Sequence, residues 1–313
     1  MAQKIIIDVD TGTDDAVALM IAALSPGLDL LGATTVNGNT AVNNCTENTL
    51  RVLDYIGRSD IPVFQGMSLP LIRKNAQQAI PPQGMHGDFL NLPEATTTMQ
   101  HQHAVDWLID TYMQSKGDII LVPVGPLTNI AAAIRKEERI LQQIQEIVIM
   151  GGSHDGGNAT PSAEFNIWLD PEAAKIVINC GRPIRMISLD ATHRALVSRE
   201  NCQQLRNTGT PAAIATALMT EQRITAYDLT QPMRRLGAAP IHDALAVCAI
   251  IDPTVVTTQL INVDVETKGD LTDGATVCDF RRRSLGQPNV AFATHADEAK
   301  FICMLLSILG QTN

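Results

Sequence analysis

The chain has 313 residues, of which 45% are hydrophobic and 18% are charged, a composition typical of folded globular proteins and unlike that of disordered ones. Its 33 acidic and 23 basic residues give a formal net charge of −10, so nucleic acid would be repelled by the protein's own field. The longest apolar runs are shorter than the roughly 18 residues of a membrane span, and the N-terminus lacks the long apolar region of a signal peptide. We therefore expect a cytoplasmic protein, a single domain over residues 1–313, with no nucleic-acid or membrane partner.

Short β-branched runs alternate with longer segments of helical period along the first two thirds of the chain. Strands are expected at residues 4–10, 28–36, 62–64, 118–122, 147–150 and 184–189, and helices at 14–25, 41–57, 129–135 and from 170 onward. This alternation predicts an α/β fold with an open, mostly parallel sheet and helices on both faces, as in Rossmann-like proteins.

The final third is expected to be more helical. Helices are predicted at 211–228 and 243–251, followed by two apolar strands and a C-terminal helix from about residue 297. Between the two α/β units, the stretch 66–98 is rich in Gly, Pro and polar residues and is too long for an ordinary connection. It is therefore expected to be a functional loop.

Four aspartates, Asp8, Asp10, Asp14 and Asp15, lie within eight residues where the first strand gives way to the first helix. Ligands of open parallel sheets bind beyond the carboxyl ends of the strands, and carboxylates crowded there would repel one another unless a cation neutralised them. Carboxylates suit Ca²⁺ or Mg²⁺ rather than zinc. Alternatively, the last two only favour the helix N-terminus through its dipole, and the first two lie in a solvated turn.

A second candidate group is the pair His242 and Asp243, which stands at the start of an apolar helix. The pair could bring an imidazole and a further carboxylate to the same edge of the sheet. On the residues alone, an aspartate that caps the helix beside an incidental histidine explains it as well.

The segment DVDTGTDDA at 8–16 resembles the N-terminal signature of the inosine-uridine nucleoside hydrolases, which cleave the N-glycosidic bond of ribonucleosides. Seven further matches follow in family order: VNGN at 36–39, HG at 86–87, VPVGPLTN at 122–129, MGG at 150–152, AEFN at 163–166, DPEAA at 170–174 and HD at 242–243. The resemblance covers most of the chain. It implies the nucleoside hydrolase variant of the α/β fold and assembly as a homodimer or homotetramer.

The resemblance also implies a calcium site. The Ca²⁺ would be held by Asp10, Asp15, the main-chain carbonyl of Val124 and Asp243. This set agrees with the six to eight oxygen ligands that Ca²⁺ takes. Asp8 would orient its neighbours rather than bind the ion.

The residues implied to bind the ribonucleoside substrate fall into groups. The ribose 2′- and 3′-hydroxyls are assigned to Asp14, Asn39 and Asn166, and the 5′-hydroxyl to Asn158 and Glu164. Phe165 and Trp168 belong to the same block and are the candidates for aromatic contacts with the substrate. Two of these residues have simpler explanations: Asn39 could cap the helix that follows, and Asn158 could serve a glycine-rich turn.

The expected chemistry assigns Asp10 as the general base that takes a proton from water and His242 as the acid for a departing purine. His86 is a candidate contact to the base or to the 5′ side, or a structural loop histidine. Arg234 could donate to a carbonyl-bearing base, which predicts uridine and inosine ahead of adenosine; alternatively it is a solvated loop charge.

Two other functions compete with hydrolysis. IDVDTG at 7–12 also resembles the strand end of haloacid dehalogenase phosphatases, where Asp8 would be the nucleophile, but no lysine follows an apolar strand as that class requires. A non-catalytic, calcium-dependent protein that binds nucleosides or sugars would keep the ribose contacts without needing the base Asp10.

Overall fold

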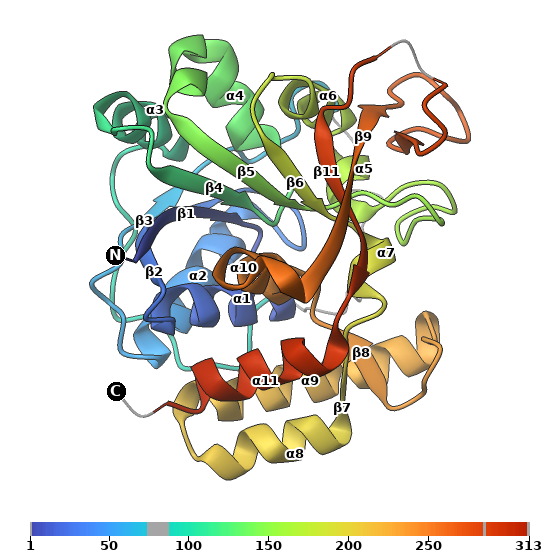
Figure 1. Ribbon diagram of the computed structural model, residues 1–313. Helices are drawn as coiled ribbons and strands as arrows, with labels where there is room; N and C mark the ends of the chain where they lie inside the picture. Colours follow the sequence, from blue (N-terminus) through green and yellow to red (C-terminus); the bar gives the residue numbers. More distant parts are fainter. Residues whose placement is uncertain (1, 74–87, 284–285, 312–313) are drawn as a thin grey trace.

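The computed structural model describes residues 2–73, 88–283 and 286–311 (Figure 1). Within these residues, one nine-stranded sheet has the order β10-β9-β11-β6-β5-β4-β1-β2-β3. Its strands are β1 (Gln3–Val9), β2 (Leu28–Thr35), β3 (Val63–Gln65), β4 (Ile119–Pro123), β5 (Ile144–Met150), β6 (Ile184–Ile187), β9 (Val256–Val265), β10 (Thr276–Asp279) and β11 (Val290–Ala296). Counted from the β3 edge, the first seven strands, ending with β11, pair in parallel. At the other edge, β9 pairs antiparallel with β11, and β10 pairs antiparallel with β9. The predicted mostly parallel sheet is therefore confirmed.

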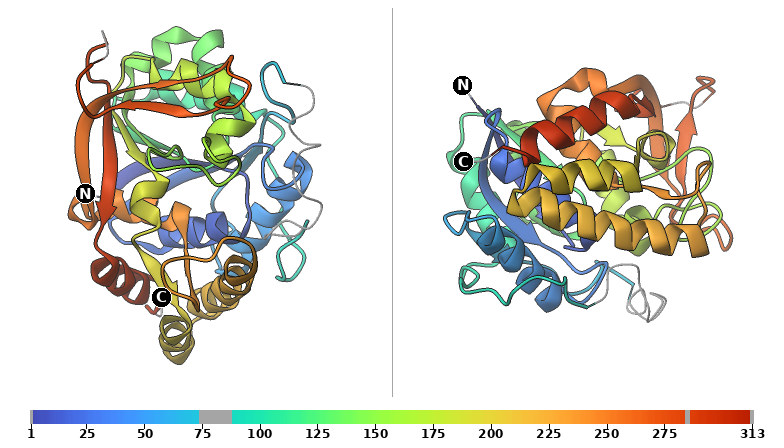
Figure 2. Two further views of the ribbon diagram at one scale, coloured as in Figure 1. Left: turned by 90° about the vertical axis from the view of Figure 1, so that its right-hand side faces the viewer. Right: turned by 90° about the horizontal axis from the view of Figure 1, so that it is seen from below.

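Helices cover both faces of the sheet (Figures 1 and 2). The longer helices are α1 (Thr13–Leu24), α2 (Val42–Tyr55), α3 (Ala104–Gln114), α4 (Thr128–Lys136), α6 (Pro171–Ile178), α8 (Arg199–Thr208), α9 (Pro211–Thr230), α10 (His242–Ile251) and α11 (Glu298–Leu309). The short ones are α5 (Phe165–Leu169), α7 (Leu189–Thr192) and the 3₁₀ turns η2 (Glu138–Gln142) and η3 (Pro253–Val255). α3, α4 and α6 lie on one face; α1, α2 and α10 lie on the other, with α8, α9 and α11 outside them.

The alternation of side chains along β1 explains the two cores. Ile5 and Ile7 point into the core beneath α1 and α10, and Ile6 points into the opposite core beneath α3 and α4. All three are fully buried, as expected of a strand covered on both faces. α1 is buried along nearly its whole length because other helices cover its outer side.

Two features of the second half differ from the sequence prediction. Three strands, β9, β10 and β11, precede the C-terminal helix where two were expected, and β7 (Leu196–Ser198) pairs with β8 (Ala238–Pro240) in a separate small sheet. α3 and α8 were also not foreseen. α8 is difficult to recognise because its sequence is mostly polar and buries only Cys202 and Leu205.

The predicted helix start at residue 170 is confirmed and has a second role. The Asp170 carboxylate caps α6 by accepting the Ala173 amide at 3.1 Å. It also accepts the Leu71 amide and the Thr128 hydroxyl, each at 2.8 Å, and so ties the 66–73 segment to the carboxyl edge of the sheet.

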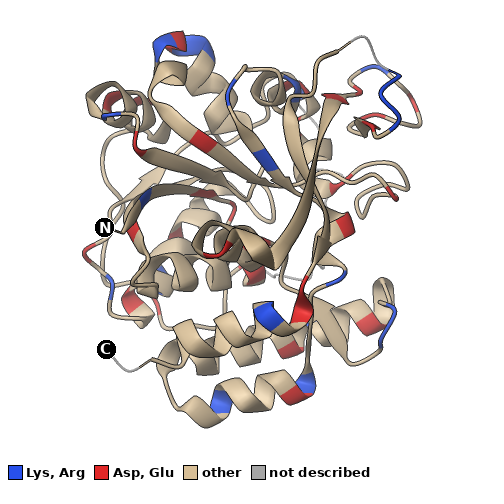
Figure 3. Cartoon of the chain, in the orientation of Figure 1, with Lys and Arg blue, Asp and Glu red and all other residues tan. Residues whose placement is uncertain are grey.

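Acidic and basic residues are interspersed along the described part of the chain and do not gather in one region of a single sign (Figure 3). None of the described helices has the length and the apolar composition needed to cross a membrane.

Candidate active site

The turn between β1 and α1 is organised by Asp15. β1 ends at Val9 and α1 begins at Thr13, and the Asp15 carboxylate reaches back over the turn. It accepts the backbone amides of Asp10 at 3.1 Å and of Gly12 at 2.9 Å. The buried carboxylate is therefore held in place at the helix N-terminus, where its charge is also favourable.

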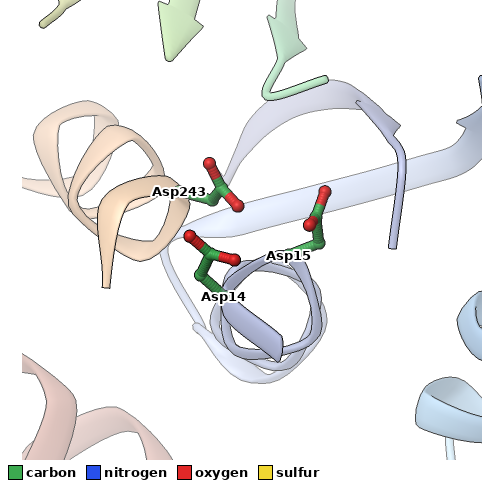
Figure 4. Close-up of side chains that lie close together, drawn as sticks. All are labelled: Asp14, Asp15 and Asp243. Atoms are coloured by element: carbon green, nitrogen blue, oxygen red, sulfur yellow. The ribbon is translucent and has the colours of Figure 1, made fainter. Parts of the chain in front are cut away.

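Three buried carboxylates converge in front of this turn (Figure 4). Asp14 and Asp15 come from the first turn of α1 and Asp243 from the first turn of α10, and each offers an oxygen within 4.8 Å of the others. A donor set of this kind suits a hard divalent cation. The structure thus brings together the two aspartate groups that are far apart in the sequence.

Asp10 lies beside this cluster and is held by the 36–39 segment. Its side chain is 1% exposed, and Oδ2 accepts the Asn39 amide at 2.7 Å. The Asn39 side chain donates to Asp15 Oδ2 at 3.1 Å, so one residue bridges two carboxylates. A Cβ atom on Gly38 would overlap the Asp10 carboxylate, which explains why glycine stands between the two asparagines of the motif.

Burial and mutual repulsion shift the acidity of the group. Burial raises the pKa of Asp15 to about 6, with a further contribution from Asp14. Burial and the charge of Asp15 raise the pKa of Asp10 well above its usual range, and burial with the charges of Asp14 and Asp15 does the same for Asp243. The group therefore favours a state in which positive charge, as protons or a cation, is bound.

Val124 and Asn166 meet at the same edge. The Val124 amide donates to the Asp8 carbonyl at 2.8 Å, and the Val124 carbonyl accepts Asn166 Nδ2 at 2.7 Å. A carbonyl oxygen has two lone pairs, so this contact leaves capacity for a second partner.

Glu164 and Asn158 shape the N-terminus of α5. The Glu164 carboxylate accepts the amides of Gly152, Asn166 and Ile167 at 3.0 to 3.2 Å, and burial raises its pKa to about 7. Asn158 Oδ1 accepts the amide of Phe165, the first residue of α5, at 2.9 Å. Both side chains thus build local structure, and Phe165 and Trp168 lie half-buried on the helix that they start.

His242 is buried between two hydroxyl groups. Its Nε2 lies 2.7 Å from the Tyr227 hydroxyl, and its Nδ1 lies 2.7 Å from Thr192 Oγ1. The ring of His193 stands 5.6 Å away, centroid to centroid, and its Nε2 is buried with no hydrogen-bond partner among the described residues. Neither hydroxyl could be connected with His242 from the sequence, because no spacing motif links them.

Arg234 lies at the surface beyond this histidine pair. Its guanidinium donates to the Arg194 carbonyl at 3.0 Å and lies 3.5 Å from the Glu298 carboxylate. The same side chain lines a cavity of about 390 Å³ together with His193 and Met233. His86, the other proposed base contact, lies outside the described residues.

The comparisons with known proteins agree with this geometry. The model of the inosine-uridine preferring nucleoside hydrolase family matches residues 5–303. A protein of that name from Leishmania major is 40% identical over 312 residues, covering 99% of this chain and 98% of its own length. A pyrimidine-specific ribonucleoside hydrolase of Escherichia coli O157:H7 is 41% identical over 283 residues, covering 88% of this chain and 87% of that protein.

A solved structure of a purine-preferring ribonucleoside hydrolase from Gardnerella vaginalis aligns with a TM-score of 0.89 at 33% identity and covers 98% of both chains. The chain belongs to the inosine-uridine preferring nucleoside hydrolase family. It is therefore an enzyme, an N-glycosyl hydrolase that acts on nucleosides.

The surroundings of Asp8 agree with hydrolase rather than phosphatase chemistry. In this nucleoside hydrolase, Asp8 is fully buried, and its Oδ1 accepts the Thr34 hydroxyl and, at 2.8 Å, Asn129 Nδ2. Burial raises its pKa to about 7. A carboxyl group enclosed in this way is poorly placed to attack phosphorus, so the haloacid dehalogenase alternative has no support from the site.

Proposed function

We propose that the enzyme is a calcium-dependent ribonucleoside hydrolase that releases ribose and free base and prefers uridine and inosine to adenosine. The observation that carries the proposal is the convergence of buried carboxylates from α1 and α10, with Asp10 beside them. The proposed calcium ligands are Asp10, Asp15, the Val124 carbonyl and Asp243.

The residues present fit a calcium ion. All four proposed ligands offer oxygen, and the raised pKa values of the three carboxyl groups indicate an excess of buried negative charge that a cation would relieve. Bound there, calcium would lower the pKa of a coordinated water and help to hold the ribose hydroxyls.

Asp10 is proposed as the general base. Its carboxylate is buried beside the cluster, where it can take a proton from a water held there. Its position is fixed by the Asn39 amide, so little reorientation is needed when the proton moves. Asp8, whose carboxylate accepts Asn129 Nδ2, is proposed as a positioning residue that supports the turn.

The ribose is assigned to the carboxylates and amides around the cluster. Asp14, Asn39 and Asn166 are proposed to bind the 2′- and 3′-hydroxyls, and Asn158 and Glu164 the 5′-hydroxyl. The three amides on the Glu164 carboxylate occupy three of about four acceptor sites, which leaves one for a hydroxyl donor.

Leaving-group help is proposed to come from His242, with Tyr227 hydrogen-bonded to it. An imidazole proton can pass to the hydroxyl at 2.7 Å while the hydroxyl gives its own proton onward, so either group can be the one that supplies the proton to a departing purine. Arg234 is proposed to favour carbonyl-bearing bases, supported by the cavity that it shares with His193. To reach a base, its guanidinium would have to leave Glu298.

A homodimer or homotetramer completes the proposal. Leu229 and Leu236, 80% and 70% exposed near the end of α9, are apolar side chains available for contacts between subunits. Sedimentation equilibrium would determine the assembly.

The decisive experiment incubates the purified enzyme with uridine, cytidine, inosine and adenosine and measures free ribose, with and without a chelator. We expect hydrolysis in the order given by the proposal, its loss on chelation and its recovery when calcium is added back. Full activity in the chelated, metal-free enzyme would contradict the calcium site.

Asp10→Asn tests the base in the same assay. The variant should fold and bind calcium more weakly, and at saturating calcium its kcat should fall by about 10²- to 10⁴-fold because an amide cannot accept the proton. Asp270→Asn, a change of the same chemistry at an exposed position, serves as the control. Wild-type turnover by Asp10→Asn would remove Asp10 from the role of base.

A further inference from the structure

Arg223 is a buried cation at the rear of the carboxylate cluster. It lies on α9 and is 1% exposed. Its Nη1 lies 2.9 Å from Asp14 Oδ1 and 3.2 Å from Thr13 Oγ1, and its Nε donates to the Pro240 carbonyl at 3.1 Å. Burying a guanidinium is costly unless other charges and hydrogen bonds compensate, so its position calls for an explanation.

The charges around Arg223 keep it ionised. Burial lowers the pKa of Arg223, but Asp14, Tyr227, Asp243 and Asp15 act in the opposite direction and leave the pKa above its usual value. Asp14 forms an ion pair with the guanidinium, and the other two cluster carboxylates, Asp15 and Asp243, also favour its charged form.

The guanidinium is also fixed in orientation. Its contacts join α1, α9 and the end of β8, and its Cζ lies 5.5 Å from the centroid of the Tyr227 ring. A planar donor fork can hold Asp14, Thr13 and Pro240 together, whereas a lysine ammonium on this stem offers a single point charge.

The formal charges give this arrangement a consequence for the metal. Asp10, Asp14, Asp15 and Asp243 carry four negative charges when all are ionised, and Arg223 reduces the sum to three. We propose that Arg223, by cancelling one of these charges, weakens the preference of the site for trivalent over divalent cations. The inference deepens the proposed function and rests on its calcium site.

The size of the effect follows from Coulomb's law. One unit charge acting over about 8 Å at an effective dielectric constant of about 20 changes the binding constant about thirtyfold for each unit of cation charge. Removing Arg223 should therefore favour Tb³⁺ over Ca²⁺ by about that factor, because the trivalent ion gains one unit more than the divalent ion does.

The test measures the dissociation constants of Ca²⁺ and Tb³⁺ by calorimetric titration of the metal-free enzyme. The ratio of the calcium to the terbium constant should rise about thirtyfold in Arg223→Met, fall in Asp14→Asn and return close to the wild-type value in the double variant. Arg185→Met is the control: it removes a partly buried arginine that pairs with Glu146, and it should leave the ratio unchanged.

The outcomes distinguish a failure of the proposed calcium site from a failure of the role proposed for Arg223. If the wild-type enzyme binds neither ion, the calcium site and this inference both fail. If it binds both and the ratio in Arg223→Met stays at the wild-type value, only the role of Arg223 is refuted. Should Arg223→Met not fold, Arg223→Gln carries the test: a raised ratio supports the inference, and a ratio equal to that of the wild type overturns it.

Discussion

Replacing Asp15 with asparagine should stabilise the calcium-free enzyme at pH 8, although the carboxylate makes several hydrogen bonds. Burial is the main reason why the pKa of Asp15 is raised from its ordinary value of 3.8 to about 6. Keeping this group ionised at pH 8 therefore costs the folded state about 3 kcal/mol, at about 1.4 kcal/mol for each pH unit. An amide of the same shape carries no such cost.

Asparagine cannot replace all the contacts. The carboxylate accepts amides on both oxygens, from Asp10 and from Gly12, and the Nδ2 of asparagine would face one of these donors. That loss is worth about 1 to 2 kcal/mol. The net expectation is a variant more stable than the wild type by about 1 to 2 kcal/mol, whereas most substitutions of buried residues destabilise.

The dependence on pH has a definite sign. Because the folded-state pKa of Asp15 is raised, the wild type carries no penalty from this group below the ordinary pKa of 3.8. The penalty on the free energy of unfolding builds up as the pH rises and is complete above about 6. The advantage of Asp15→Asn should thus be largest at pH 8 and fall by about 1.4 kcal/mol by pH 5, where the two enzymes should be nearly equal in stability. Urea unfolding at both pH values, with a chelator present, measures it.

Calcium should reverse the order of stability. At a free concentration 100 times the dissociation constant, binding to the native state alone adds about 2.7 kcal/mol to the wild type, and the variant that lacks a ligand should gain much less. Asp29→Asn, at an exposed position of β2, should respond to neither variable. An Asp15→Asn enzyme that is less stable than the wild type in chelator at pH 8, by the same margin at pH 5, would refute this account of the cluster.

Further expected outcomes concern the substrate and the fold. Uridine monophosphate should be hydrolysed far more slowly than uridine, because its phosphate would approach the Glu164 carboxylate in a shielded place; equal rates for both would remove Glu164 from the 5′ position. His242→Ala should lower kcat/KM for inosine by at least tenfold more than for uridine. Arg234→Ala should reduce the preference of the enzyme for uridine and inosine over adenosine. Both predictions are checked by measuring kcat/KM for uridine, cytidine, inosine and adenosine. Asp170→Ala, which loses three hydrogen bonds to α6, Leu71 and Thr128, should lower the free energy of unfolding by about 2 to 4 kcal/mol, measured in urea.

The sequence was sufficient to predict the central fold. β1, β2 and β4 are apolar strands separated by helical segments, and the predicted bounds differ from the observed ones by one or two residues. Local patterns work well there because the core demands apolar side chains at nearly every position of a strand covered on both faces. They fail for α8, since a helix at the outside of the molecule needs only a narrow apolar face.

Part of the site could also be predicted. The convergence of Asp15 with Asp243, 228 residues apart, was implied by the family resemblance and not by the rule for strand ends, because α10 follows β8, which belongs to the separate small sheet. The structure adds Asp14 as the third carboxylate within 4.8 Å, where the resemblance implied Asp10. Asp10 stands beside this group, and its contact with the Asn39 amide is a long-range one that no local pattern reveals.

The contacts that sequence analysis missed share one property. Arg223, Tyr227 and Thr192 reach the site from elements that lie outside the β1 turn, and each acts on a residue that the sequence did identify. On a helix such as α9, an arginine and a tyrosine four residues apart have the spacing of an ordinary surface pair. Only the packing of α9 against α1 turns this pair inward, where one side chain meets Asp14 and the other meets His242.

This arrangement divides the site in a way that bears on base selectivity. The carboxylate turn of β1 and α1 is joined through Arg223 to α9, and α9 leads directly into the segment that carries Met233 and Arg234. Relatives with pyrimidine-specific and purine-preferring names are 41% and 33% identical to the chain, so membership of the family does not by itself fix the base. If the carboxylate cluster serves the ribose, which all ribonucleosides share, selectivity must come from the other half, at the end of α9 and the loop that follows it.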